Sequence, residues 1–182
     1  MDPESILSFW FEECRPWQWF CRRDDFDALV RRRFLEATEA ALKGDLRRWE
    51  DGPDRALALV LLLDQFPRQL FRGQAKAFAG DRRAVGLSLK ALRQGWVDDQ
   101  AERARRQFWL MPLLHNEDAD LVARAIPLLQ RYSDEATAAV ARRNLQQLQE
   151  FGRYPRRNQA LGRVSTEEEL RRLDKRQQRL KG

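Results

Sequence analysis

Apolar residues recur at three- and four-residue intervals along most of the chain, which is the spacing of helices that bury one face. The pattern is clearest in the segment 26–41, where Phe26, Val30 and Phe34 mark one face of a long helix that Gly44 is expected to end. Polar and apolar residues do not alternate with period two over any convincing length. The pattern therefore predicts an all-α protein.

Helix-start and helix-stop signals divide the chain into segments of helical length joined by short turns. Met111-Pro112 is expected to stop one helix, and Pro127 to kink the next. Ser165-Thr-Glu-Glu168 has the pattern of a capping box before a charged last helix. Such helices suggest antiparallel hairpins stacked as an irregular array. The expected starts are Pro3, Asp24 or Asp25, Pro53, Asp81, Asp98 or Asp99, Asn116, and Ser133 or Asp134.

Length and composition limit the class of protein. A chain of 182 residues with 43% hydrophobic and 34% charged residues predicts one globular domain over residues 1–182, with a basic tail that frays from about residue 171. No apolar run approaches the ~20 residues of a membrane helix, and the start of the chain is acidic, so we expect a cytoplasmic protein. The cysteines, Cys14 and Cys21, and one histidine give no disulfide framework or zinc set, so no metal or cofactor is expected.

The first group of candidate functional residues follows the most apolar segment, in LLLDQFPRQLFRG (residues 61–73). Pro67 lacks an N–H, so the helix is predicted to end or kink between Leu63 and Phe66. If helical geometry resumes, Asp64, Arg68 and Arg72 share one face. The simpler interpretation is an ion-pair ladder that locks the kink. The alternative is a carboxylate that holds a guanidinium group toward a ligand.

The second group lies in RRQFWLMPLLHNEDAD (residues 105–120), which contains His115, the only histidine of the chain. Glu117 and Asp118 fall in the first turn of an expected helix, where the helix dipole alone favours carboxylates. His115 is either a packed residue that donates to a backbone carbonyl or a proton carrier near neutral pH.

The third group lies in FGRYPRRNQALGR (residues 151–163), a segment rich in arginine that Tyr154 could pin to the core. Arg153 and Arg157, with the amide of Asn158, suit recognition of a carboxylate or phosphate. A solvated basic loop without a ligand is the alternative that composition leaves open.

Taken together, these segments resemble the bacterial domain-of-unknown-function 924 (DUF924) family, whose members look like tetratricopeptide-type helical proteins. The resemblance rests on FWF, LLLDQFPRQLFRG, AFAGDRRA, RRQFWLMPLLHNEDADL, EFGRYPRRNQALGR and STEEE, in the expected order from Phe9 to about Leu173. It implies a right-handed array of helical hairpins with a concave surface. Arg156 stands where the family typically has histidine, Leu110 where tyrosine is usual, and Gln69 where asparagine is common.

We expect the three polar groups to converge on one pocket, because each has a chain-breaking proline and an apolar anchor beside it. The leading hypothesis is a binding module for an anionic small molecule or an acidic peptide end. Asp64 and Glu117 would hold the arginines in place, and Asn158 would supply directional hydrogen bonds. The candidate ligand-binding residues are Asp64, Arg68, Arg72, Arg153, Arg157 and Asn158.

Two further hypotheses stay open. In an enzyme, His115 would be the general acid or base, oriented by Glu117, with arginines stabilising a developing anion. Alternatively, the net charge of +6 and exposed aromatic residues could bind RNA, although a membrane partner is not expected. Binding to RNA would depend steeply on salt concentration, whereas one anion in a buried pocket would not.

Overall fold

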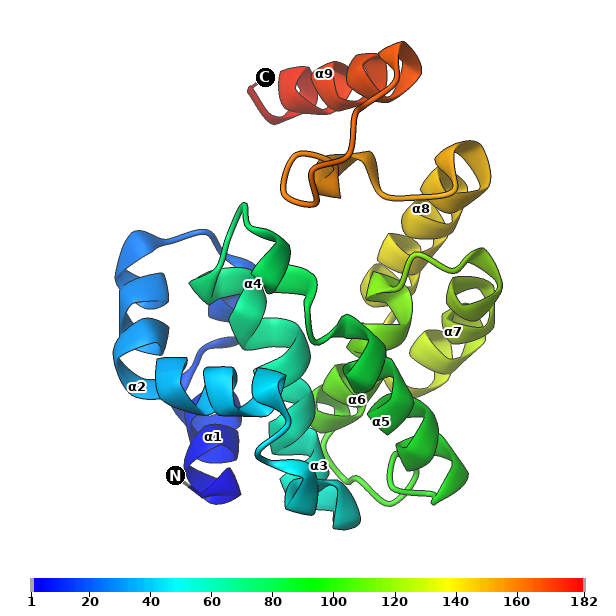
Figure 1. The fold of residues 1–182 in the computed structure, drawn as a ribbon. Coiled ribbons are helices and arrows are strands. Elements are labelled where there is room, and N and C mark those ends of the chain that lie inside the picture. The colour runs from blue at the N-terminus through cyan, green and yellow to red at the C-terminus, as the bar shows by residue number, and fades with distance from the viewer. Residues whose placement is uncertain (1, 182) are drawn as a thin grey trace.

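The computed structural model describes the backbone of residues 2–181 and the side chains of residues 2–174. Within residues 2–181 the secondary structure is helical and contains no strand, which confirms the all-α prediction (Figure 1). The tetratricopeptide-type arrangement and the single-domain organisation stay predictions. Fraying of the basic tail also stays a prediction, because the side chains from residue 175 onward lie outside the described part of the chain.

The amino-terminal half contains the helices that carry the first polar group, residues 61–73. Helix α1 packs against α3, and α2 packs against α4 (Figure 1). The elements of the amino-terminal half are α1 (Pro3–Ser8), a π-helical turn (Phe9–Glu13), a 3-10 helix (Pro16–Phe20), α2 (Asp24–Lys43), a 3-10 helix (Arg47–Asp51), α3 (Pro53–Val60), a second π-helical turn (Leu61–Gln65) and α4 (Phe66–Leu70).

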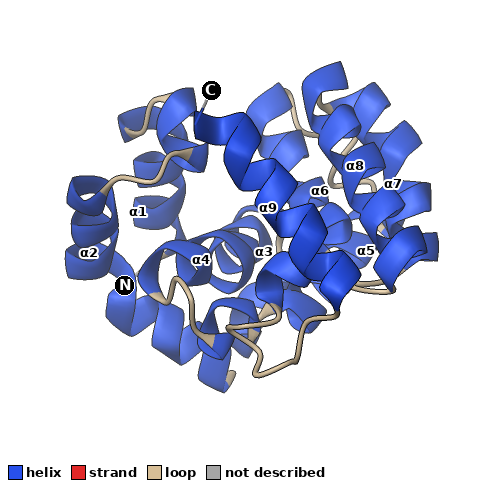
Figure 2. Ribbon diagram, turned by 90° about the horizontal axis from the view of Figure 1, so that it is seen from above, coloured by secondary structure: helices blue, strands red, loops and turns tan. Residues whose placement is uncertain are grey.

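In the carboxy-terminal half, α5 packs against α6, α6 against α7, and α7 against α8. The last helix, α9, lies above this body in Figure 1 and crosses in front of α3 and α5 when viewed from above (Figure 2). The elements are a 3-10 helix (Ala75–Phe78), α5 (Asp81–Arg93), α6 (Arg103–His115), α7 (Ala119–Tyr132), α8 (Glu135–Phe151), a 3-10 helix (Pro155–Arg157) and α9 (Glu167–Lys181).

A cluster of buried aromatic rings joins the two halves. Phe66 lies 5.0 Å from Phe34 and 5.2 Å from Trp10 between ring centroids. Trp10 in turn lies 5.4 Å from Phe108 of α6, edge to face. Aromatic pairs at these separations are worth about 0.5–1.5 kcal/mol beyond the area they bury. The cluster therefore holds α6 in a defined position beside the second π-helical turn.

Prolines affect the helices differently from the sequence-based expectation. The helix does not end before Pro67. Where the sequence predicts an end or a kink, it widens into the π-helical turn Leu61–Gln65, in which the N–H of Phe66 bonds to the carbonyl of Leu61. The predicted stop at Pro112 is wrong, because α6 continues through this proline to His115. Pro112 is buried, so packing outweighs the lost hydrogen bond.

Several helix boundaries also differ from the predictions. Helix α6 begins at Arg103 rather than at Asp98 or Asp99, and Asp98 accepts hydrogen bonds from Tyr132 and Arg131. Asp118, not Asn116, caps α7.

The capping box of α9 pairs Thr166 with Glu169, one residue later than expected. The Thr166 N–H donates to Glu169 Oε2 at 2.8 Å, and the Glu169 N–H donates to Thr166 Oγ1 at 3.2 Å. The starts at Pro3 and Pro53, the start capped by Asp134 and the stop at Gly44 are as predicted. Helix α2 begins at Asp24, but Arg23 occupies its cap position in place of the predicted Asp24 or Asp25.

Candidate functional site

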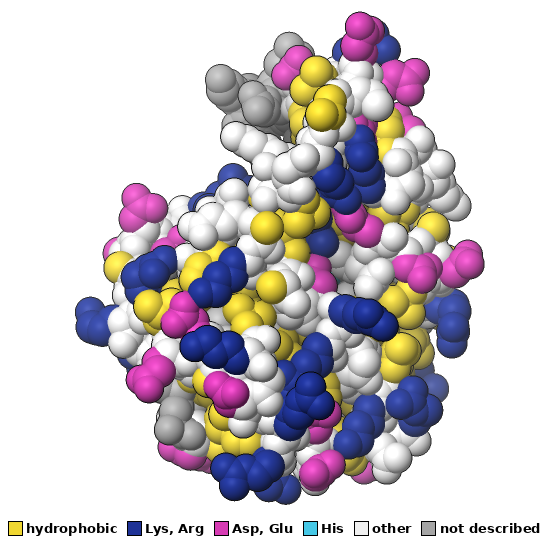
Figure 3. Space-filling view, in the orientation of Figure 1, with side chains coloured by type: hydrophobic (Ala, Val, Ile, Leu, Met, Phe, Trp, Pro, Cys, Tyr) yellow, Lys and Arg dark blue, Asp and Glu magenta, His cyan; other side chains and the backbone are white. Residues whose placement is uncertain are grey.

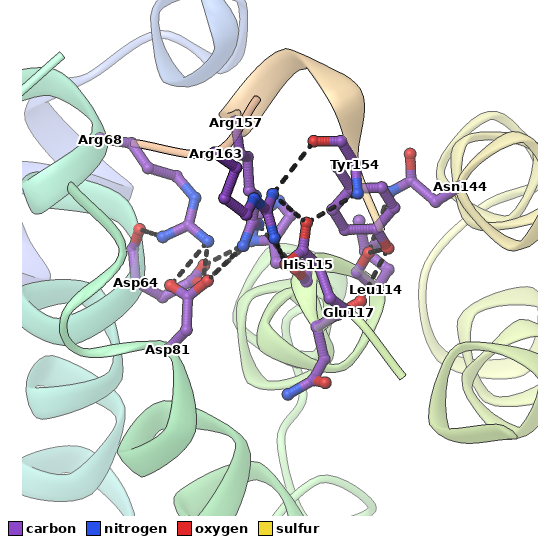
Figure 4. Close-up of polar contacts among 11 residues, drawn as sticks. Asp64, Arg68, Asp81, Leu114, His115, Glu117, Asn144, Tyr154, Arg157 and Arg163 are labelled. Carbon is purple, nitrogen blue, oxygen red and sulfur yellow. Dashed lines mark hydrogen bonds and ion pairs between the residues drawn. The ribbon is translucent and has the colours of Figure 1, made fainter. Parts of the chain in front are cut away.

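The centre of the site is a hydrogen-bonded pair formed by Asp64 and His115. Asp64 lies in the π-helical turn and is completely buried. Nδ1 of His115, the last residue of α6, lies 2.9 Å from Oδ1 and 3.0 Å from Oδ2 of Asp64 (Figure 4). Gln65 also donates to the Asp64 carboxylate. Residues 51 positions apart in the sequence are thus joined in one pair.

Arginines and a second carboxylate extend this pair into a network from four separate segments of the chain (Figure 4). Arg68 Nη2 lies 3.2 Å from Asp64 Oδ1 and 2.9 Å from Asp81 Oδ1. The other oxygen of Asp81 accepts from Arg157 Nη1 at 2.9 Å. Arg157 Nη2 donates at 2.6 Å to the backbone carbonyl of His115. The three polar groups expected from the sequence therefore meet within hydrogen-bonding distance.

Local backbone features place these side chains together. Pro67 has no N–H to donate to the carbonyl of Leu63, four residues earlier. Gly80 approaches this same carbonyl so closely that a Cβ atom would lie 2.3 Å from the Leu63 oxygen. Asp81 follows immediately as the first residue of α5. The absence of a side chain at Gly80 is therefore what allows Asp81 to lie near Asp64.

A second network fastens the arginine-rich segment to the end of α6. Glu117 pairs with Arg163 through contacts of 2.7 and 2.9 Å, and it accepts the Tyr154 N–H at 2.7 Å. The buried Tyr154 hydroxyl lies 3.0 Å from the carbonyl of Leu114 and 2.8 Å from that of Asn116. This network positions the backbone that carries Arg157.

Arg153 and Asn158 connect the same segment to α9. Arg153 donates to both oxygens of Glu169, at 2.7 and 2.9 Å. Asn158 is buried and donates to Glu169 Oε2 at 3.1 Å and to Ser165 Oγ at 3.0 Å. Neither residue contacts the Asp64–His115 pair. Their predicted role in ligand binding stays a prediction.

Two predicted contacts are wrong. Arg72 does not continue a ladder from Asp64, because the helix ends at Leu70 and Arg72 pairs with Asp27 of α2 at 2.6 Å. Glu117 pairs with Arg163 instead of orienting His115, and Asp64 takes the orienting position.

The sequence-based reasoning missed Asp81, which it interpreted only as a helix start. It also gave no role to Arg163. The glycine directly before Asp81 was the available signal, since glycine at a helix start can mark a close backbone approach.

Burial and the neighbouring charges define the protonation of the central pair. Burial opposes ionisation of Asp64, but Arg68 and His115 outweigh it and lower the pKa of Asp64 to about 2. Burial lowers the pKa of His115 below its usual value, and the opposing effect of Asp64 does not restore it. Near neutral pH, the pair is therefore a carboxylate beside a neutral imidazole, with Nδ1–H donating to Asp64.

Two adjacent cavities open beside His115, whose side chain is 12% exposed. The larger has a volume of about 750 Å³ and the smaller about 490 Å³. With Nδ1 engaged by Asp64, Nε2 is the ring nitrogen left to face them. The residues that line both cavities are Trp19, Phe20, Met111, His115 and Arg156.

Three further observations concern surface charge, possible metal ligands and membrane-spanning helices. On the face shown in Figure 3, Lys and Arg side chains are interspersed with Asp and Glu and do not gather into one area of a single sign. Among the described residues, no group of three or more His, Cys, Asp and Glu side chains is arranged to hold a metal ion. Within residues 2–181, no helix combines the length and apolar character needed to cross a membrane.

Residues 6–177 match the model of a family described as "Bacterial protein of unknown function (DUF924)". The chain belongs to this family. It is also similar to a solved protein of unknown function from Agrobacterium tumefaciens, with 35% identity and a TM-score of 0.87. The alignment covers 95% of this chain and 97% of that chain. No curated protein matches the sequence.

Membership in the DUF924 family makes the position of Arg156 informative. The resemblance leads us to expect a histidine there, and Arg156 lines both cavities beside His115. The position where the resemblance predicts a departure from the family pattern therefore lies within the candidate site. Leu110 is buried in α6, and Gln69 lines the smaller cavity.

Proposed function

We propose that this protein binds an anionic small molecule in the smaller cavity. The observation that carries the proposal is the charge of the lining: it includes five arginines and no aspartate or glutamate. These arginines are Arg22, Arg68, Arg72, Arg156 and Arg157.

The carboxylates that hold two of these arginines support the proposal. Asp64 and Asp81 pair with Arg68 and Arg157, but neither carboxylate is part of the cavity lining. The guanidinium groups are thus oriented before a ligand arrives. Less side-chain conformational entropy is therefore lost on binding. A hydrogen bond to a charged group contributes about 1.5–3 kcal/mol. Losing one such contact corresponds to roughly tenfold weaker binding or more.

The test measures the stabilisation of the protein by inorganic phosphate, acetate and phenyl phosphate, using thermal denaturation and calorimetric titration. Arg22 is exposed and Arg72 is 40% exposed in its side chain, so the double variant R22Q/R72Q should fold. The matched control, R142Q/R171Q, removes the same charge from exposed sites outside both cavities.

Binding that is lost in R22Q/R72Q and kept in R142Q/R171Q supports the proposal. Equal weakening in both double variants would identify non-specific attraction, and no binding of any of the three anions would overturn the proposal.

A second candidate function is acid–base catalysis, and the Asp64–His115 pair favours it. A buried carboxylate fixes the tautomer of the imidazole, so that Nε2 can accept a proton from a molecule in the cavity. Because His115 is the only histidine, its ¹⁵N resonances can be assigned without ambiguity. The expected spectrum at pH 7 is that of a neutral ring with the proton on Nδ1. A protonated ring, or a proton on Nε2, would refute a role for Nε2 as a general base.

A further inference from the structure

The two cavities beside His115 differ in their chemistry. The smaller is lined by arginines without a carboxylate. The larger carries both signs of charge, with Arg103 and Arg156 balanced by Glu102 and Asp134, so it offers an anion no comparable attraction. Its remaining lining is mostly apolar, and the residues that line this cavity alone include Pro16, Ala104, Leu114, Ala136 and Val140.

Two amide donors that line the larger cavity already have partners within the protein. Gln107 Nε2 donates to Thr137 Oγ1 at 3.1 Å, and Asn144 Nδ2 donates to the carbonyl of Leu114 at 2.9 Å. An apolar ligand would therefore leave these donors satisfied, and it would displace water from an apolar surface. This cavity is suited to the uncharged part of a ligand.

The cavities adjoin at the ring of His115. Trp19, Phe20 and Met111 line both cavities, so a ligand that spanned the two would contact aromatic and thioether side chains in each. Phe20 is 57% exposed, which places a large apolar side chain at the rim, where a bound apolar group would cover it.

We propose that the ligand is an amphiphilic anion, with its charged group in the smaller cavity and an alkyl or aryl body in the larger one. The bond that joins the two parts would then lie beside Nε2 of His115. This inference rests on the proposed function, because it assumes that arginines of the smaller cavity bind the charged group. It adds the chemical class of the remaining part of the ligand and the place where that part lies.

The size of the larger cavity sets the expected dependence on chain length. A volume of about 750 Å³ corresponds to roughly 25 groups of the size of a water molecule. Burial of one methylene group is expected to strengthen binding about fourfold. Affinity should therefore rise with each added methylene across a short alkyl series, which a site for the charged group alone would not produce.

The test is calorimetric titration with ethyl, butyl, hexyl and octyl phosphate below their micelle concentrations, and with the corresponding alkyl carboxylates as a second arm. The second arm distinguishes a phosphate from a carboxylate as the preferred charged group. V140W narrows the larger cavity at a position that is 37% exposed, so the variant should fold. Q146W is the matched control, because Gln146 is an exposed residue of the same helix outside both cavities.

In the wild type and in Q146W, affinity should rise about fourfold per methylene. V140W should remove this rise while leaving the affinity for ethyl phosphate unchanged, and R22Q/R72Q should weaken all members of the series by the same factor. If short anions bind but affinity does not depend on chain length, or V140W does not change that dependence, the amphiphile inference fails and the proposed function stands. If no member of either series binds, both fail.

Discussion

The contact between Gly80 and the π-helical turn gives the sharpest test of how the site is assembled. A Cβ atom at Gly80 would lie 2.3 Å from the oxygen of Leu63 and 2.9 Å from its Cα and carbonyl carbon. Ordinary carbon contacts need about 3.5 Å, so the backbone must separate by about 1 Å. The backbone angle φ of Gly80 is −88°, which alanine adopts freely, so the clash alone determines the outcome.

The substitution G80A should destabilise the protein by about 1–3 kcal/mol, the usual cost of forcing extra atoms into a packed site. For a chain of this size, each kcal/mol lowers the melting temperature by about 2–4 °C. The assay is thermal denaturation followed by circular dichroism. The control is G86A, because Gly86 lies within α5 and a Cβ atom there meets nothing within 4 Å. This control should stabilise the protein by about 0.5–1 kcal/mol through helix propensity.

The displacement should also reach the candidate site, because Asp81 follows Gly80 directly and its carboxylate holds Arg68 and Arg157. The imidazole resonances of His115 should shift in G80A and stay unchanged in G86A. A melting temperature for G80A at or above that of the wild type would refute the close approach, and with it the explanation for the position of Asp81.

Three further predictions follow from the hydrogen bonds and charges of the structure. Wild-type stability should fall as the pH drops below about 6.5, because burial depresses the pKa of His115 and only the unfolded chain then gains a proton at that position. Urea titrations of H115Q should lack this part of the pH dependence. D81N should cost about 3 kcal/mol in urea denaturation, since Arg157 is buried and loses its charged partner, whereas R171A removes an exposed pair and should change stability by under about 0.5 kcal/mol. T166A should cost about 1 kcal/mol in the same assay by removing the cap of α9, and an unchanged midpoint would contradict that capping role.

Much of the local structure could be predicted because its causes are local. Pro3 and Pro53 at helix starts, and Gly44 after a helix, act through backbone geometry within a few residues. The predicted helix stop at Pro112 fails because packing overrides a local signal. Pro112 is a strong breaking signal by itself, and only its burial within α6 explains why the helix continues to His115.

The sequence by itself determined the helical class, the three polar groups and the irregularity near Pro67. It could not determine which charges pair, because Asp64 and Asp118 are equivalent carboxylates until packing places one of them beside His115. The aromatic cluster sets the position of α6, and the close approach of Gly80 sets that of Asp81. Pairing between side chains far apart in sequence depends on where helix ends meet in space, and only the tertiary structure decides that.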